Sequence, residues 1–208
     1  MLFRGAALLP ATMLLGCAGD ELPAEVPTVA DTTAQPAPDG SARLEPTAAC
    51  TDDDDDPTLE QTEGPFFSPG SPLRRSLLEP GTRGRRLVVT GLVLSANCRP
   101  VGRAVLEFWQ ADADGEYDNE GFTLRGHQRT DADGRYRLET VVPGAYPGRT
   151  RHLHVKVSRA RSSAVLTTQL YFPGEAANRN DGLYDRTLAM RVGRSGRVRT
   201  GRFDFVLA

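Results

Sequence analysis

The feature that most limits the fold of this chain is the texture of its sequence after about Pro57. Short apolar runs alternate there with Gly, Pro, Asp and Asn, and no long stretch repeats with the period of a helix. Many short strands separated by turn residues give this pattern. The sequence therefore predicts an all-β fold, an antiparallel β-sandwich with long functional loops.

Seven runs are expected to form strands, because each is apolar or alternates apolar with polar side chains. They are Arg86–Leu94, Arg103–Ala111, Tyr136–Val142, His152–Ser158, Val165–Phe172, Leu188–Val192 and Phe203–Leu207. Turns are expected at three dipeptides, Asp114-Gly115, Asp133-Gly134 and Pro143-Gly144. The polar stretches 112–134 and 173–187 are expected to be loops, which is where functional residues commonly lie.

Residues 1–17 match an export signal, with one positive charge at Arg4 and an apolar run too short to span a bilayer. The tetrapeptide Leu14–Cys17 resembles the lipobox of bacterial lipoproteins, in which the cysteine is lipidated and becomes the new N-terminus. An ordinary cleaved signal with an incidental Cys17 is the alternative. We therefore expect an exported protein, either held at a periplasmic or cell-surface membrane by lipid on Cys17 or secreted.

Residues 18–56 are rich in Ala, Pro, Thr and Asp and carry few large apolar side chains. Such a segment does not bury enough surface to offset the entropy of ordering, so it is expected to be a disordered tether before a folded domain at 57–208. The run Asp52–Asp56 is interpreted as a solvated, self-repelling stretch. A calcium site is the alternative, but the run lacks the spacing of a calcium loop.

Charge and cysteine content narrow the function classes further. The chain has 25 basic and 27 acidic residues and a net charge of -2, so no overall basic field exists to attract nucleic acid or an anionic membrane. Of its three cysteines, Cys50 and Cys98 remain if Cys17 carries lipid. In an oxidising compartment this pair is expected to form a disulfide, with two separate thiols as the alternative.

The strongest local signal is the His-x-His pair in the run Arg151–Val157. Strand alternation puts His152 and His154 on one face and the apolar residues between and after them on the other. Two such imidazoles can converge on one transition metal. The pattern alone leaves open that they are two partly exposed surface histidines.

Further ligands must come from elsewhere in the chain. The third histidine is His127, and a thiolate zinc site is not available if the cysteines are paired. A ferrous site of two histidines and one carboxylate stays open from the residues alone. Its candidate carboxylates are Glu107, Asp112, Asp114 and Asp131.

Several blocks in fixed order decide between these readings: Thr62-Glu63-Gly64-Pro65-Phe66, Glu107-Phe108-Trp109-Gln110-Ala111-Asp112, Gly115-Glu116-Tyr117, Thr130-Asp131-Ala132-Asp133-Gly134, Pro143-Gly144-Ala145-Tyr146-Pro147 and Arg149-Thr150-Arg151-His152-Leu153-His154. From about residue 60 to the end, the chain resembles the intradiol ring-cleavage dioxygenases. Such a series is far more specific than any one block. The resemblance implies that 57–208 is a catalytic domain.

The resemblance also implies a cofactor and a site. Non-haem Fe(III) would be held by Tyr117, Tyr146, His152 and His154, with Arg149 and Gln169 beside the substrate. The reaction would cleave the ring of a catechol-type aromatic diol between its two hydroxylated carbons, using O2, to give a muconate-type dicarboxylic acid. Phenolate is a hard donor that favours the ferric state.

Individual roles follow from the same resemblance. Tyr146 would be the ligand that dissociates when the substrate binds and takes up a substrate proton, while Tyr117 stays bound. His127 is expected to have a structural or supporting role, because the ligand set is complete without it. The remaining tyrosines receive no ligand role; these are Tyr136, Tyr171 and Tyr184.

Two other functions compete with this one. A transthyretin-like sandwich without catalytic activity would have the same layers and could serve as a binding lipoprotein. A zinc or copper site at His152 and His154 would need neither tyrosine. The expected partners are an aromatic diol and O2, with no nucleic acid and with membrane contact only through Cys17. The sequence is compatible with a monomer and with a homodimer.

Overall fold

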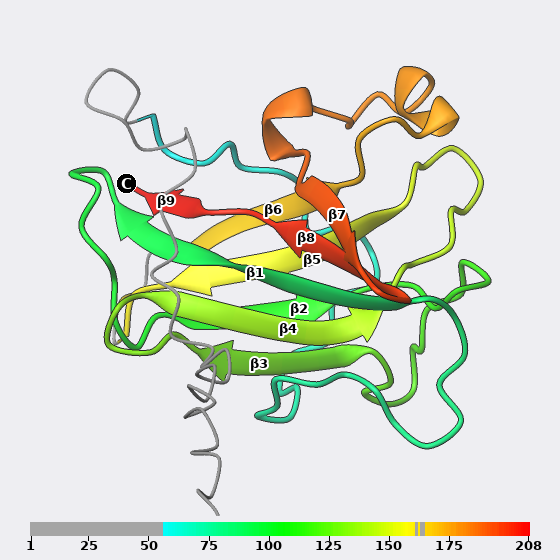
Figure 1. The fold of residues 1–208 in the computed structure, drawn as a ribbon, viewed down its shortest axis with the longest axis horizontal. Helices are drawn as coiled ribbons and strands as arrows, with labels where there is room; N and C mark the ends of the chain where they lie inside the picture. Colours follow the sequence, from blue (N-terminus) through cyan, green and yellow to red (C-terminus); the bar gives the residue numbers. More distant parts are fainter. Residues whose placement is uncertain (1–55, 161, 163–164) are drawn as a thin grey trace, which may run out of the picture. The chain divides into compact units, whose positions relative to one another are not determined.

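The computed structural model describes residues 56–160, 162 and 165–208 of the chain. These residues form two β-sheets packed face to face, with long loops outside them (Figure 1). The expected all-β sandwich is confirmed. No helix in this part of the chain is long and apolar enough to cross a membrane.

The larger sheet has the order β4-β1-β8-β7, and β9 also pairs with β1. Its strands are β1 (Arg86–Ser95), β4 (Arg135–Val141), β7 (Arg191–Ser195), β8 (Val198–Arg202) and β9 (Phe205–Leu207). β1 pairs antiparallel with β4 but parallel with β8 and β9, so this sheet is mixed, whereas antiparallel pairing had been expected throughout.

The smaller sheet has the order β3-β2-β5-β6 and is antiparallel throughout. Its strands are β2 (Val105–Trp109), β3 (Arg125–Arg129), β5 (His152–Ser158) and β6 (Val165–Tyr171). Two short 3-10 helices lie between β6 and β7, η1 (Ala176–Arg179) and η2 (Arg186–Leu188).

The inner faces of both sheets form one apolar core. Alternation along a strand sends every second side chain inward, and in the central strands the inward ones are buried. Leu153, Val155 and Val157 of β5 and Val89 of β1 belong to this cluster. Because the inward residues of β5 are apolar, its histidines must face outward from the core.

One predicted strand needs correction, and two strands were not predicted. The run Leu188–Val192 was expected to be one strand, but Leu188 ends η2 and β7 begins only at Arg191. The carboxylate of Asp185 accepts the N–H of Thr187 at 2.8 Å, which starts a helical turn in place of a strand. The sequence also failed to predict β3 and β8, whose polar, arginine-rich residues lack the apolar alternation of a strand.

Pairing register arranges polar residues in rows across the outer face of the smaller sheet. Arg125 pairs with Trp109, Trp109 with His154, and His154 with Gln169, so these four stand in one row. His152 pairs with Tyr171 in the next row. Strands far apart in the sequence thus bring their polar side chains to one place.

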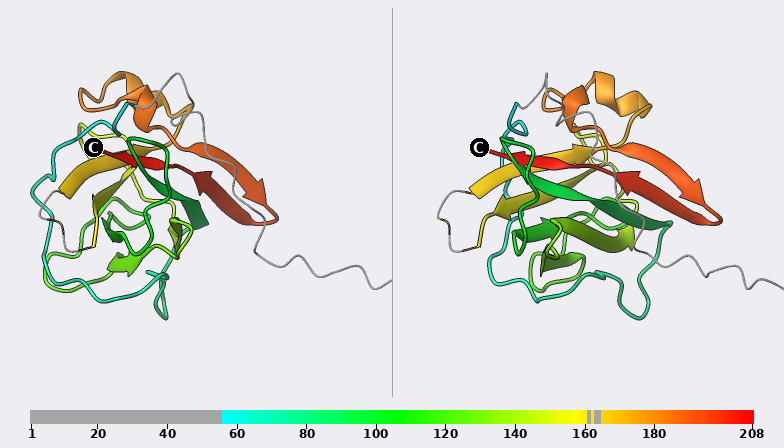
Figure 2. Two further views of the ribbon diagram at one scale, coloured as in Figure 1. Left: turned by 90° about the vertical axis from the view of Figure 1, so that its left-hand side faces the viewer. Right: turned by 60° about the vertical axis from the view of Figure 1, so that its left-hand side comes forward.

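A covering segment, residues 57–77, runs across this outer face (Figure 2, cyan). At one edge the N–H of Gln61 donates to Thr167 of β6 at 2.8 Å, and at the other the N–H of Arg74 donates to His127 of β3 at 2.8 Å. Between them the ring of Phe67 packs 4.9 Å from that of Trp109. The polar rows are therefore shielded from solvent.

Candidate metal centre

The two histidines of β5 point at each other from the outer face. His152 and His154 are 2% and 1% exposed, and their Nε2 atoms lie 3.1 Å apart. His152 Nδ1 lies 2.7 Å from the carbonyl oxygen of Thr150. This contact requires the proton on Nδ1 and leaves the lone pair of Nε2 available to a metal. Burial lowers the pKa of His152 to about 4 and that of His154 well below its usual range. Both imidazoles are therefore neutral near pH 7, the form that binds metals.

Two tyrosines complete a ring of four side chains. The ring of Tyr146 lies 5.8 Å from that of His152, the ring of Tyr117 lies 6.1 Å from that of His154, and the two phenols are 5.9 Å apart. The hydroxyl of Tyr117 is buried without a hydrogen-bond partner. Burial also raises the pKa of the Tyr117 phenol above its ordinary value. A buried hydroxyl without a partner is costly, so this group fits a metal cation that would bind its phenolate.

The tyrosines come from loops that are locked together by two glycines. The N–H of Gly144 donates to the carbonyl oxygen of Asp112 at 2.7 Å, which joins the loop of Tyr146 to the loop of Tyr117. A Cβ at Gly144 would lie 2.4 Å from the nitrogen of Gly115, and one at Gly115 would lie 2.6 Å from the oxygen of Ala145. Only glycine permits this approach of the two backbones.

Aromatic rings cover the centre from two sides. Phe66 of the covering segment stacks on Tyr117 at 4.4 Å, and Trp109 stacks on His154 at 4.8 Å with an interplanar angle of 8°. These contacts fix the orientations of one tyrosine and one histidine. They also exclude water from the side of the centre that they cover.

Arg149 and Gln169 meet beside the four rings, as their predicted role requires. Arg149 Nη1 lies 3.4 Å from the Tyr146 hydroxyl, and Arg149 Nη2 donates to Gln169 Oε1. The Gln169 amide in turn donates to the carbonyl oxygen of Thr62 at 2.9 Å. Tyr171 was given no ligand role; its ring is buried, and its hydroxyl lies 3.0 Å from Gln169 Oε1 and so joins this network.

Two charged residues at the site were not predicted. Arg125, 1% exposed, donates to the backbone oxygens of Asp118 and Phe66 and so holds both chain segments around Tyr117. Asp181, in the loop before β7, binds Arg149. Nothing in a single sequence separates these residues from the many arginines and aspartates at the surface.

The alternative carboxylate-ligated site finds no support among the residues that the structure describes, since no three His, Cys, Asp or Glu side chains there are grouped to hold a metal. The candidate carboxylates are engaged elsewhere. Glu107 accepts from Ser71, Asp114 from Arg83, and Asp112 and Asp131 from N–H groups of their own loops.

His127 lies away from the four rings, two residues further along β3 than Arg125, with Nδ1 2.7 Å from the carbonyl oxygen of Ser71. This contact agrees with the supporting role expected for it. Cys17, Cys50 and all of Asp52–Asp56 except Asp56 fall outside the described residues, so lipidation, the disulfide to Cys98 and the state of the acidic run stay predictions.

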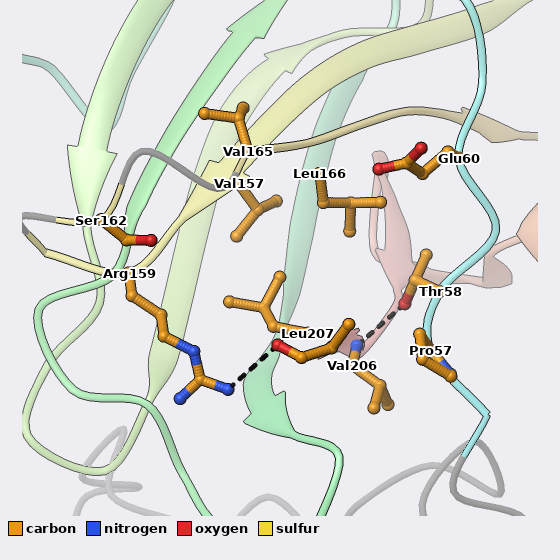
Figure 3. Close-up of a pocket in the computed structure, with 11 residues that line it drawn as sticks. Pro57, Thr58, Glu60, Val157, Arg159, Ser162, Val165, Leu166, Val206 and Leu207 are labelled. Atoms are coloured by element: carbon orange, nitrogen blue, oxygen red, sulfur yellow. Dashed lines mark hydrogen bonds between the residues drawn. The ribbon is translucent and has the colours of Figure 1, made fainter.

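A cavity of about 310 Å³ lies at the far end of β5 (Figure 3). Its wall includes Val157, Arg159, Leu166 and Leu207. At a rise of about 3.3 Å per residue, Val157 lies roughly 16 Å along the strand from His152. None of the predicted site residues lines this cavity. It is therefore separate from the candidate metal centre.

Comparisons with known proteins identify the family of this chain. Residues 62–207 match a protein-family model described as "Dioxygenase". The protocatechuate 3,4-dioxygenase beta chain of Burkholderia cepacia is 36% identical over 121 residues, which is 50% of this chain and 52% of that protein. The 6-chlorohydroxyquinol 1,2-dioxygenase of Cupriavidus pinatubonensis is 31% identical over 173 residues, 69% of this chain and 62% of that protein. This chain thus spans between about half and three fifths of these curated relatives.

Solved structures of dioxygenases are also similar to this chain. The dioxygenase domain of a dioxygenase carbohydrate-binding protein fusion from Streptomyces sp. SirexAA-E is 54% identical, with a TM-score of 0.71 over 73% of this chain and 98% of that one. The 3-chlorocatechol 1,2-dioxygenase of Rhodococcus opacus 1CP is 26% identical, with a TM-score of 0.66 over 72% of this chain and 71% of that one. The likeness therefore extends over most of the part of the chain that the structure describes.

Proposed function

Since this chain belongs to the intradiol ring-cleavage dioxygenase family, we propose that it cleaves a catechol-type aromatic diol between its two hydroxylated carbons, using non-haem Fe(III) and O2, to a muconate-type dicarboxylic acid. One observation carries the proposal. The buried, unpartnered hydroxyl of Tyr117 lies in the same ring of side chains as Tyr146 and the two facing imidazoles. A binding module would have no need for this donor set.

Tyr117, Tyr146, His152 and His154 would hold the iron. Ferric iron bound there would supply a Lewis acid that both diol oxygens can bind, which favours attack of O2 on the ring. The histidines contribute neutral nitrogen donors, and the hydrogen bond from His152 to Thr150 fixes which nitrogen is free. Stacking by Phe66 and Trp109 keeps the donors in place and limits access of water.

Tyr146 would take a proton from the substrate at its phenolic oxygen when the diol binds. Arg149 Nη1 lies 3.4 Å from its hydroxyl. We expect Tyr146→Phe to lower turnover on the order of 100-fold, because proton transfer by a positioned side chain contributes about that much. Steady-state kinetics with catechol would measure it. Tyr184→Phe is the control, and unchanged turnover in Tyr146→Phe would remove this role.

Arg149 and Gln169 would orient the diol and stabilise charge that develops on its ring. Their side chains are tied to each other, to Thr62 and to Tyr171, so their positions are set before substrate arrives. Arg149→Ala should therefore lower turnover while leaving iron content intact, which metal analysis and kinetics on the same sample would test.

The first test of the function is an anaerobic visible spectrum of the purified domain, with metal analysis, before and after addition of catechol. An iron(III) tyrosinate band that shifts with catechol is the expected result. Product analysis after admission of O2 should then give the ring-opened dicarboxylic acid. A colourless protein filled with zinc, or one that takes up no metal, would refute the proposal.

We further propose that the protein is exported and anchored by lipid on Cys17, with residues 18–56 as tether and a disulfide between Cys50 and Cys98. The lipobox-like Leu14–Cys17 and the composition of the tether support this. Mass spectrometry of the unreduced membrane fraction should find a lipidated cysteine at the N-terminus and no free thiol. Free thiols at Cys50 and Cys98 would contradict the disulfide.

A further inference from the structure

The loop 173–187 reaches the site through a single buried residue. Asp181 is the only buried residue in this loop, and its side chain is 1% exposed. Neighbours on both sides, Asn180 and Gly182, are exposed. A buried carboxylate is costly unless it is paired and hydrogen-bonded, so its partners indicate why it is there.

All four contacts of Asp181 lead to the site or stabilise its own turn. Arg149 Nε lies 3.2 Å and 3.0 Å from the two carboxylate oxygens. The N–H of Thr150 donates to Oδ2 at 2.9 Å, and the N–H of Leu183 donates to Oδ1 at 2.9 Å. The carboxylate therefore fixes the Arg149 side chain and the backbone that follows it, just before the first histidine.

The guanidinium is planar, so fixing its Nε edge sets the direction of its other two nitrogens. Those nitrogens face the site: Nη1 lies 3.4 Å from the Tyr146 hydroxyl, and Nη2 contacts Gln169 and, at 3.4 Å, the Tyr171 hydroxyl. The same loop is held a second time, because the Tyr171 hydroxyl donates to the carbonyl oxygen of Leu183 at 2.8 Å. The loop is thus tied to the site at both Arg149 and Tyr171.

We propose that Asp181 is a positioning residue for ring cleavage, which acts by holding the Arg149 guanidinium against Tyr146 and Gln169. This inference rests on the proposed function, because it assigns Asp181 a part in that reaction. Asp181 contacts none of the four predicted iron ligands directly; it binds the Arg149 side chain, and it reaches His152 only through the backbone of Thr150.

The test uses the iron-loaded full chain with Asp181→Asn, which keeps the size of the side chain and removes its charge. We expect the iron content and resting visible band of the wild type, with kcat for catechol lower by on the order of 10-fold to 100-fold, the range for a displaced orienting group. In an Arg149→Ala background, Asp181→Asn should cause no further loss. Wild-type kcat, or a loss that adds fully to that of Arg149→Ala, would overturn the proposal.

Asp185→Asn is the matched control. Asp185 lies in the same loop and accepts hydrogen bonds from Thr187 at 2.8 Å and 2.6 Å, but it contacts no site residue. Its substitution is expected to leave kcat unchanged. An equal fall in kcat for Asp185→Asn would mean that any weakening of the loop reduces activity, and the specific role of Asp181 would be rejected.

A measurement that needs neither iron nor turnover tests the positioning role separately from the proposed function. In the metal-free protein, the Nε–H of Arg149 followed by NMR should exchange slowly with solvent, and Asp181→Ala should make its exchange fast. Fast exchange in the wild type would overturn the positioning role. Failure of the proposed function would instead appear as a wild-type protein with slow Nε–H exchange that takes up no iron.

Discussion

His152 and His154 lie on β5, a strand that is hydrogen-bonded on both sides by β2 and β6, whereas Tyr117 and Tyr146 lie in loops outside the sheets. Register with β2 and β6 fixes His154, register with β6 fixes His152, and backbone contact through Gly115 and Gly144 fixes the tyrosines. The centre therefore joins a half held by the sheet to a half held by a loop clamp. Substitutions in the sheet half and in the loop half should therefore have different effects on the centre.

The largest effect is expected from His154→Ala in the sheet half. Loss of a ligand should lower iron affinity by more than the roughly 100-fold that loss of a supporting group costs. Metal analysis and the visible spectrum would measure it. His127→Ala is the control on the same sheet face, because His127 contacts Ser71 and lies away from the four rings; it should weaken iron binding without abolishing it. Full iron content in His154→Ala would remove it from the ligand set.

The loop clamp is tested by Gly144→Ala. The new Cβ would lie 2.4 Å from the nitrogen of Gly115 and 2.7 Å from the oxygen of Ala113, so the two loops must separate. We expect a stability loss of about 2 to 3 kcal/mol in urea unfolding, the range for overpacking, together with a weaker tyrosinate band. The histidines should be less affected, since β5 does not take part in the clamp.

Gly148→Ala is the matched control for the clamp. Gly148 lies in the same loop as Gly144, and its φ of +79° disfavours alanine, but nothing lies within 4 Å of its Cβ position. Its substitution should cost about 1 kcal/mol through backbone strain and leave the tyrosinate band unchanged. Equal losses of the band in both variants would mean that the clamp is not specific to Gly115 and Gly144.

The two halves also differ in how far the sequence predicts them. Alternation in Arg151–Val157 predicts β5 and the shared face of its histidines from the residues alone. No periodicity exists in the tyrosine loops, so Tyr117 and Tyr146 are identified only through the resemblance to a family. Alternation in the sequence predicts the geometry of the strand, whereas the geometry of the loops depends on contacts between segments that are distant in the sequence.

The same reason explains what the sequence did not predict. Strand β3 lies under the covering segment, and its outward Arg125 binds the backbone oxygens of Phe66 in that segment and of Asp118 in the tyrosine loop in place of water. Asp181 lies in a polar loop, and only the folded chain brings it to Arg149, 32 residues away. Both residues are defined by tertiary contacts, which leave no local pattern.

The smallest expected effect concerns the pH dependence of the loop half. The carboxylate of Asp118 accepts backbone N–H groups of Glu120, Gly121 and Thr123 at 3.0 Å, 2.8 Å and 2.9 Å. These bonds, that of Gly121 foremost, hold the pKa of Asp118 well below its usual range. The loop after Tyr117 thus depends on an ionised side chain of its own.

The direction in which stability changes with pH follows from this lowered pKa. In the unfolded chain an aspartate has a pKa of about 3.9, so Asp118 contributes stability above about pH 4, and this contribution is lost as pH falls towards the folded-state value. Asp118→Asn should cost roughly 1 kcal/mol or less at pH 7, the net value of a typical hydrogen bond. The difference between wild type and variant in urea unfolding should shrink between about pH 4 and pH 3. A difference that stays constant over that interval would mean that the charge of Asp118 does not stabilise the tyrosine loop, which would then depend on its glycine clamp and on Arg125.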